Sequence, residues 1–204
     1  MSIEAPWLYL ASQSPRRRQL LEQWGLRCEL LLPDPHEDAE GLEVVRPNEA
    51  PASYVKRVTR LKLEHALLRL QRRGLPDGPV LCADTTVALG RQILGKPDSP
   101  DHAAQILRQL SGQRHQVLTA VALAHQGRVY QALSRSSVQF SPLTEAQIAH
   151  YVASGEPMGK AGAYAIRGLC GIFVERLEGS YSGVMGLPLF ETSMLLSRFG
   201  IKVL

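Results

Sequence analysis

The chain has 204 residues, of which 45% are hydrophobic and 21% are charged, and its formal net charge is +4 at pH 7. This composition can form a globular core, and it excludes an intrinsically disordered chain. No apolar run approaches the roughly 18 to 20 residues of a membrane-spanning helix, and the first residues carry no basic leader. We therefore expect neither a membrane segment nor a secretory signal.

Cysteine and histidine spacing indicates a reduced protein without zinc. The three cysteines are far apart and form no C-x-x-C pair, which is typical of core thiols in a cytoplasmic protein. The six histidines show no H-E-x-x-H or similar spacing. Aromatic residues make up only 6% of the chain and do not alternate with the basic clusters, so no specific nucleic-acid partner is expected.

The N-terminal half alternates predicted strands and helices. Residues 8–11 form an apolar strand, after which Ser14 is placed as a helix N-cap with Pro15 at the first helical position. This helix is expected to end at Gly25. The elements expected next are a strand at 28–32, a polar loop at 33–50, a helix at 51–73 and an apolar strand at 80–83 that runs into Asp84.

The C-terminal half combines helices with a hairpin. Thr144 and Gln147 form a capping-box pattern for a helix to residue 153. The other expected elements are a helix from 98 to 112, strands at 115–124 and 129–140 around a turn at 126–128, a strand at 172–176 and a helix at 188–199, with a glycine-rich irregular stretch at 156–171. This order predicts an α/β fold with a mixed sheet and flanking helices. No repeat, low-complexity tract or linker divides residues 1–204, so a single domain is expected.

Two adjacent arginines stand where a helix begins, in the segment Ser12-Gln13-Ser14-Pro15-Arg16-Arg17. The first turn of a helix carries partial positive charge and free N–H groups, so Arg16 and Arg17 are locally unfavourable there. A bound polyanion would reverse that effect, and arginine contacts phosphate oxygens in pairs. The alternative is a solvated surface turn with incidental arginines.

Several acidic and basic side chains are candidates for a metal and phosphate site. Asp84 follows an apolar strand, and ligands of open α/β sheets bind at the carboxyl ends of strands. A carboxylate there can hold Mg²⁺ or activate water, although a turn-forming aspartate is a common alternative. Glu37 in the long loop could add a second carboxylate, whereas an acidic loop residue is more often solvated. Lys62 lies in the middle of a helix, where a solvated lysine is the default.

Two familiar motifs are excluded by their details. Residues 90–96 have the spacing G-x-x-x-x-G-K, but Pro97 follows where a P-loop needs Ser or Thr. Lys96 nevertheless remains a candidate phosphate ligand. Residues 179–183 have the spacing of a nucleophile elbow, but Tyr181 takes the place of the nucleophilic serine.

Together these segments resemble the Maf family of nucleoside triphosphate pyrophosphatases. They follow the family order over nearly the whole chain. The matching segments are LYLASQSPRR (8–17), ADTTV (83–87), KP (96–97), LSGQ (110–113), GEPMGKAGAY (155–164), GSY (179–181) and GLPL (186–189).

The resemblance implies an ITPase-like fold with two lobes around a deep cleft, usually in a homodimer. It implies hydrolysis of nucleoside triphosphates to monophosphate and pyrophosphate with a divalent metal, namely Mg²⁺, Mn²⁺ or Co²⁺. Asp84 would be the general base, and it would hold the metal and the attacking water together with Glu37, with Lys96 beside them. The substrate-binding residues would be Ser12, Arg16, Arg17, Lys62, Lys96, Thr85 and Arg167.

The stretch 155–168 resembles the subfamily that acts on dTTP and UTP. The usual pattern there is Tyr-Gly-Ile-Gln-Gly, whereas this chain has Tyr164-Ala165-Ile166-Arg167-Gly168. A glutamine amide can donate and accept, but arginine can only donate, so modified pyrimidines and other bases stay open. Two other readings are a triphosphatase that releases orthophosphate and a non-catalytic nucleotide- or nucleic-acid-binding protein linked to cell division.

Overall fold

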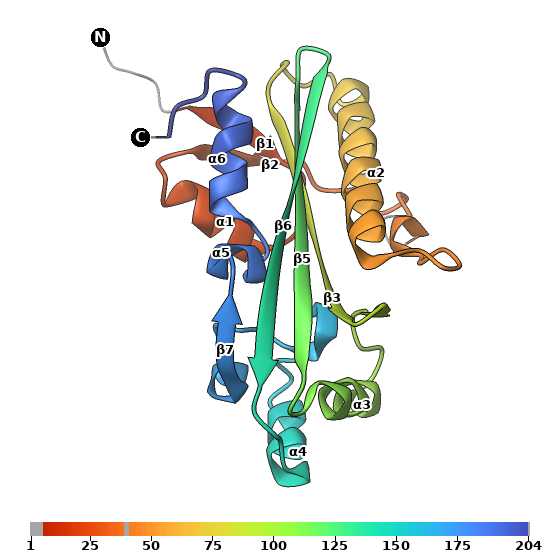
Figure 1. The fold of residues 1–204 in the computed structure, drawn as a ribbon. Helices are drawn as coiled ribbons and strands as arrows, with labels where there is room; N and C mark the ends of the chain where they lie inside the picture. The colour runs from red at the N-terminus through yellow and green to blue at the C-terminus, as the bar shows by residue number, and fades with distance from the viewer. Residues whose placement is uncertain (1–5, 39–40, 204) are drawn as a thin grey trace.

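The computed structural model describes residues 6–38 and 41–203, and Figure 1 shows its ribbon. Its strands form one mixed sheet in the order β2-β1-β3-β5-β6-β7, with β4 beside β3. β1 pairs in parallel with β2 and β3, and the remaining pairs are antiparallel. The strands are β1 (Trp7–Leu10), β2 (Arg27–Leu30), β3 (Val80–Leu89), β4 (Gln92–Leu94), β5 (Arg114–His125), β6 (Arg128–Phe140) and β7 (Val174–Glu178).

Helices cover both faces of the sheet at one end and gather at the other end (Figure 1). They are α1 (Pro15–Glu22), α2 (Pro51–Arg72), α3 (Pro100–Leu110), α4 (Glu145–Ala153), α5 (Tyr181–Val184) and α6 (Leu189–Ser197). The described residues also form short 3₁₀ helices at η1 (Gly41–Glu43), η2 (Ala161–Ala163) and η3 (Leu169–Phe173). The α/β fold class predicted from the sequence is confirmed.

Alternating residues of β3 divide the core between the two faces of the sheet. Leu81 and Ala83 pack with α1 and α6, whereas Val80 and Cys82 pack with α2. Successive side chains of a strand point to opposite faces, so a nearly continuous apolar run marks a strand buried on both sides. A separate cluster around Phe140 joins the far ends of β3, β5 and β6 to α3 and α4. The long strands therefore connect two packed regions.

Local signals placed most element ends correctly. Ser99 accepts a hydrogen bond from the His102 N–H, and the Thr144 capping box is present. Gln126 and Gly127 both have positive φ, which the tight turn between β5 and β6 requires. β4 and α5 were not predicted, and β7 begins two residues later than expected.

β3 is longer than the apolar run that predicted it. Asp84 does not end the strand but pairs with Ala120 in the middle of a continuous antiparallel ladder with β5. The β-branched residues Thr85, Thr86 and Val87 extend the strand, because such residues fit a pleated, half-buried surface. β1, the parallel neighbour of β3, stops at Leu10. Asp84 therefore lies just beyond the carboxyl end of β1, where the sheet opens.

Candidate active site

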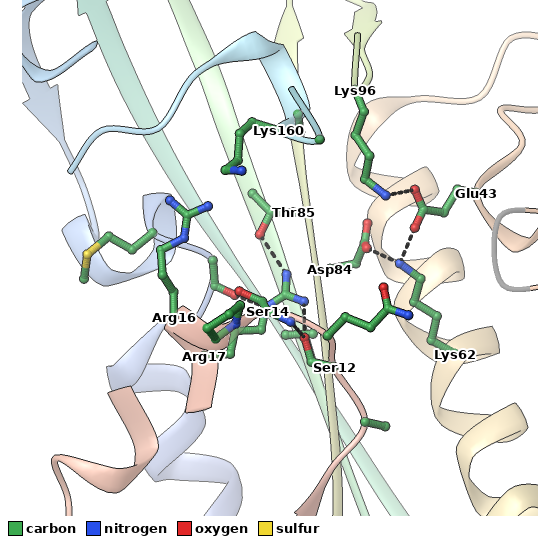
Figure 2. A pocket seen from close by; sticks show the side chains of 18 of the residues that line it. Ser12, Ser14, Arg16, Arg17, Glu43, Lys62, Asp84, Thr85, Lys96 and Lys160 are labelled. Carbon is green, nitrogen blue, oxygen red and sulfur yellow. Dashed lines mark hydrogen bonds and ion pairs between the residues drawn. The ribbon is translucent and has the colours of Figure 1, made fainter. Parts of the chain in front are cut away.

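A cavity of about 410 Å³ opens where β1 stops. Its walls come from the β1–α1 turn, the loop before α2, α2 itself, β3, Lys96 and two C-terminal segments around residues 159–166 and 184–186. This volume lies within the roughly 300 to 1,000 Å³ that is usual for small-molecule sites. Figure 2 shows the polar side chains that converge on the cavity from these elements.

Arg17 ties three wall segments together. Its Nε donates to the Gly186 carbonyl at 2.7 Å, Nη1 to Ser12 Oγ at 2.9 Å and Nη2 to Thr85 Oγ1 at 3.4 Å. Burial lowers the pKa of Arg17 despite the nearby Asp84 carboxylate, but an arginine stays charged near neutral pH. Arg17 is thus a fixed positive charge in the wall, with Thr85 and Ser12 acting as its hydrogen-bond partners.

Arg16 and the start of α1 are available to an anion. Ser14 occupies the N-cap position, but its side chain makes no capping hydrogen bond, and its own N–H donates to Ser12 Oγ at 3.2 Å. Within the described residues, no hydrogen bond or ion pair holds the Arg16 guanidinium, which lies beside the cavity in Figure 2. A helix N-terminus without a side-chain cap offers free N–H donors to a phosphate.

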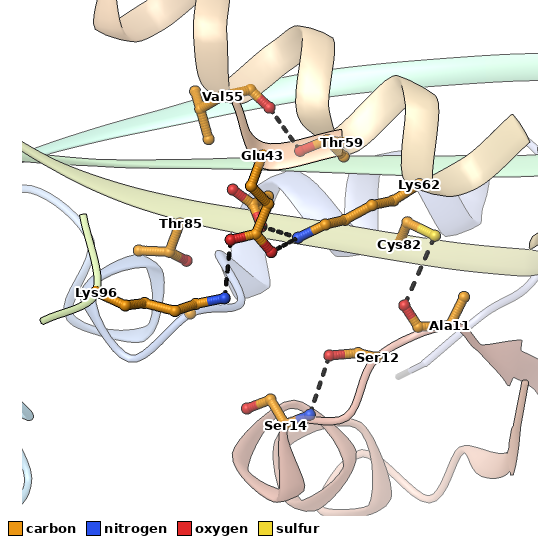
Figure 3. A network of polar contacts seen from close by, with 12 residues as sticks. Ala11, Ser12, Ser14, Glu43, Val55, Thr59, Lys62, Cys82, Thr85 and Lys96 are labelled. Carbon is orange, nitrogen blue, oxygen red and sulfur yellow. Dashed lines mark hydrogen bonds and ion pairs between the residues drawn. The ribbon is translucent and has the colours of Figure 1, made fainter. Parts of the chain in front are cut away.

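The opposite wall carries a network of charged side chains formed by Lys62, Asp84, Glu43 and Lys96 (Figures 2 and 3). Lys62 Nζ donates to Asp84 Oδ1 at 2.5 Å and to Glu43 Oε1 at 2.7 Å. Lys96 Nζ donates to Glu43 Oε2 at 2.8 Å. The structure therefore brings the predicted residues Asp84, Lys62 and Lys96 together, and it adds Glu43, which the sequence analysis did not single out.

The network keeps Lys62 and Glu43 charged. Burial of Lys62 lowers its pKa, but the carboxylates of Asp84 and Glu43 outweigh that effect, so the pKa lies above its usual value. Burial of Glu43 raises its pKa, and Lys62 and Lys96 together bring the pKa below its usual value. Lys62 is thus an ammonium and Glu43 a carboxylate at neutral pH.

Glu37 borders the cavity but is already paired with α2. Its carboxylate accepts hydrogen bonds from Arg69 at 3.0 and 2.5 Å and from Arg72 at 2.6 Å. The Arg69 hydrogen bonds lower the pKa of Glu37 to about 2, with burial opposing them and Arg72 assisting. The structure shows no contact between Glu37 and Asp84, and Arg69 and Arg72 hold the Glu37 carboxylate. Its metal-ligand role stays a prediction.

Arg167 is not among the residues that line the cavity, and its substrate-binding role stays a prediction. Its exposed side chain approaches Gln19 of α1, with Nη1 at 3.4 Å from Oε1. The neighbouring residues Tyr164, Ala165 and Ile166 do line the wall. Lys160, which the sequence analysis missed, lines the same wall with its Nζ near the Met158 carbonyl at 3.3 Å.

The donor set can accept a hard cation through one carboxylate. Within residues 6–38 and 41–203, no three or more His, Cys, Asp or Glu side chains gather in a metal-binding group. Asp84 Oδ2, however, receives no hydrogen bond from that part of the chain, whereas Oδ1 is bound to Lys62. Mg²⁺ commonly takes one or two carboxylates and completes its shell with water and substrate phosphates. Asp84 fits that role.

Known proteins match nearly the full chain. A relative from Albidiferax ferrireducens is 61% identical over 97% of this chain and 98% of its own, and one from Cupriavidus pinatubonensis is 60% identical over 96% and 98%. Both are named dTTP/UTP pyrophosphatase. Among solved structures, the Staphylococcus aureus Ham1 protein matches with a TM-score of 0.44 and 12% identity over 66% of this chain and 71% of that chain.

No described helix is long and apolar enough to cross a membrane.

The family model described as Maf-like protein matches residues 7–199. That match, together with relatives of about 60% identity over nearly their whole length, establishes that the chain belongs to the Maf family.

Proposed function

We propose that this protein hydrolyses nucleoside triphosphates to the monophosphate and pyrophosphate, with dTTP, UTP or modified pyrimidine nucleotides as substrates. The observation that carries the proposal is the set of cationic side chains that line the cavity together with Asp84. The names of the relatives support the reaction and the pyrimidine preference. The arginine and lysine side chains that line the cavity with Asp84 are Arg16, Arg17, Lys62, Arg69, Lys96 and Lys160.

The cationic groups bind the phosphate chain. Arg16 and the uncapped start of α1 face it from one wall, and Lys62 and Lys96 face it from the other (Figure 2). A triphosphate carries close to four negative charges, and cleavage leaves further charge on the departing pyrophosphate. Fixed positive groups stabilise that developing charge without having to reorganise during the reaction.

Asp84 accepts the proton of the attacking water. Its carboxylate is fixed by Lys62 and faces the cavity from the middle of β3. The water oxygen attacks the α-phosphorus, the bond from that phosphorus to the bridging oxygen breaks, and pyrophosphate leaves. In-line displacement of this kind depends on positioning and electrostatics more than on covalent chemistry.

A divalent cation, Mg²⁺, Mn²⁺ or Co²⁺, would be held by Asp84 together with substrate oxygens and water. When bound, it would withdraw charge from the phosphate oxygens. Glu37, which Arg69 and Arg72 hold at the border of the cavity, remains a candidate for a second carboxylate.

The proposal also includes a homodimer in the cytoplasm, as the family resemblance implies. Multi-angle light scattering of the purified protein tests the first point, and a mass of one chain would contradict it. Microscopy of the tagged chain in its host tests the second.

The deciding experiment is product analysis over a nucleotide panel of dTTP, UTP, CTP and 7-methyl-GTP with Mg²⁺ or Mn²⁺. We expect monophosphate and pyrophosphate from the pyrimidine nucleotides, no turnover with excess chelator, and a loss of about a thousandfold in kcat for Asp84→Asn. Glu64→Gln on the exposed face of α2 is the control. Release of orthophosphate would contradict the bond assignment, and binding without turnover would identify a binding protein.

A further inference from the structure

Glu43 is paired with Lys62 and Lys96, the two lysines that bind the phosphate chain in the proposed function. Its two carboxylate oxygens accept hydrogen bonds from different lysines, Oε1 from Lys62 and Oε2 from Lys96. Nothing in the proposed reaction uses Glu43. Its two oxygens nevertheless occupy the positions beside the lysines that negatively charged phosphate oxygens would take.

The contact is well defined because the backbone around Glu43 is fastened to α2. Tyr54 Oη donates to the Glu43 carbonyl at 2.9 Å, and Arg57 donates to the Val44 carbonyl at the same distance. Arg57 also forms an ion pair with Glu49 at 2.7 Å, farther along the same loop. Glu43 therefore reaches the lysines from a fixed point, and its side chain alone can swing away from them.

Lys62 and Lys96 cannot bind Glu43 and a phosphate at the same time without weakening both contacts. Lys62 Nζ already serves two carboxylates, and solvent reaches only 22% of its side chain and 25% of that of Glu43. A phosphate oxygen bound to the same ammonium would come close to the Glu43 oxygens in a poorly solvated place. Like charges repel strongly there because the effective dielectric is low.

We propose that Glu43 is an internal competitor of the substrate: it neutralises Lys62 and Lys96 in the empty site, and the triphosphate must displace it. This inference rests on the phosphate-binding role of the two lysines in the proposed function. A ligand with several charged phosphates can replace one carboxylate on both lysines, whereas a single phosphate has less to offer. Glu43 thereby selects for the long phosphate chain of the substrate.

The test is isothermal titration calorimetry with inorganic tripolyphosphate in metal-free buffer with chelator. Glu43→Gln keeps the shape of the side chain and removes its charge. Exposed pairs are worth little and partly buried pairs more, so we expect tripolyphosphate to bind about three- to tenfold more tightly to this variant than to the wild type. Orthophosphate binding, measured in the same way, should show that the variant discriminates less between long and short anions.

Glu64→Gln provides the matched control, because it removes one negative charge from an exposed pair with Arg60 on α2. Its tripolyphosphate affinity should equal that of the wild type. Glu43→Ala repeats the experiment if the glutamine variant fails to fold, with thermal melts run beside both.

Unchanged or weaker tripolyphosphate binding by the Glu43 variants would overturn the inference, as would no binding by any form of the protein. Nucleotide turnover by the wild type is measured separately. If the wild type turns over nucleotides and Glu43→Gln binds tripolyphosphate no more tightly than the wild type, only the role of Glu43 is refuted. If the variant binds tripolyphosphate more tightly but the wild type turns over no nucleotide, only the proposed reaction is refuted. A need for more metal in Glu43→Gln, at unchanged metal-free affinity, would make Glu43 a metal ligand instead.

Discussion

We expect the ion pair between Glu37 and Arg69 to stabilise the folded protein, and the size of its contribution to the free energy of unfolding follows from the structure. Solvent reaches only 5% of the Arg69 side chain and 15% of that of Glu37. Glu37→Gln would leave the buried guanidinium without its counter-charge. Removing one partner of a buried pair is destabilising because the remaining charge is left uncompensated.

The magnitude follows from the pKa of Glu37, which the Arg69 hydrogen bonds lower from 4.5 to about 2. If the pair were fully buried, this difference in pKa would be worth about 3 kcal/mol, at about 1.4 kcal/mol for each pKa unit. Solvent reaches 58% of the Arg72 side chain, which supplies part of the effect. We therefore expect a loss of about 2 kcal/mol and a fall in Tm of about 4 to 8 °C at pH 7.

The pH dependence has a definite sign. A carboxylate with a depressed pKa in the folded state contributes fully above its unfolded pKa of about 4.5, and the contribution is lost as pH falls toward about 2. Urea unfolding of the wild type and of Glu37→Gln should therefore show a difference that is constant from pH 7 to about 5 and shrinks at lower pH.

Glu64→Gln is again the control, since both members of its pair are 48% exposed and its loss should stay below about 0.5 kcal/mol. An equal loss for the two variants, or a difference that does not shrink in acid, would refute the reasoning. The kinetics of Glu37→Gln also decide on the metal role. If Glu37 is a metal ligand, Glu37→Gln needs a higher metal concentration for its half-maximal rate. If Glu37 only anchors the loop, the variant is less stable and that metal concentration is unchanged.

The remaining predictions concern Arg17 in the cavity wall, the packing of η2 against β3, and one helix end. Arg17→Lys keeps the charge but cannot reproduce the three hydrogen bonds to Ser12, Thr85 and Gly186, so kcat/KM for the triphosphate should fall about tenfold or more at similar metal dependence. Gly162→Ala places a Cβ 2.8 Å from the Val87 side chain at a φ of 68°, and calorimetry should show a loss of about 1 to 3 kcal/mol; wild-type stability would contradict it. Thr144→Ala removes the capping box and should cost about 1 kcal/mol in urea unfolding, with unchanged nucleotide turnover.

The sequence by itself determined the fold class, most of the helices and strands, and the chemistry of the cavity wall at the start of α1. Caps, turns and apolar periodicity act between near neighbours, so the turn at Gln126-Gly127 and the Thr144 cap appear where their residues predict. Arg16 stands out for the same reason, because two arginines at the start of a helix conflict with its dipole.

The tertiary structure decided which charges meet. The loop before α2 offers several carboxylates, and sequence position cannot say which of them reaches the site. Glu43 contacts Lys62 from 19 residues away and Lys96 from 53, while Glu37 pairs with Arg69 from 32. Such contacts depend on how α2 packs on the sheet and on where the loop is fastened. The tertiary structure likewise leaves Arg167 exposed beside Gln19 and out of the cavity lining, which the motif around it did not reveal.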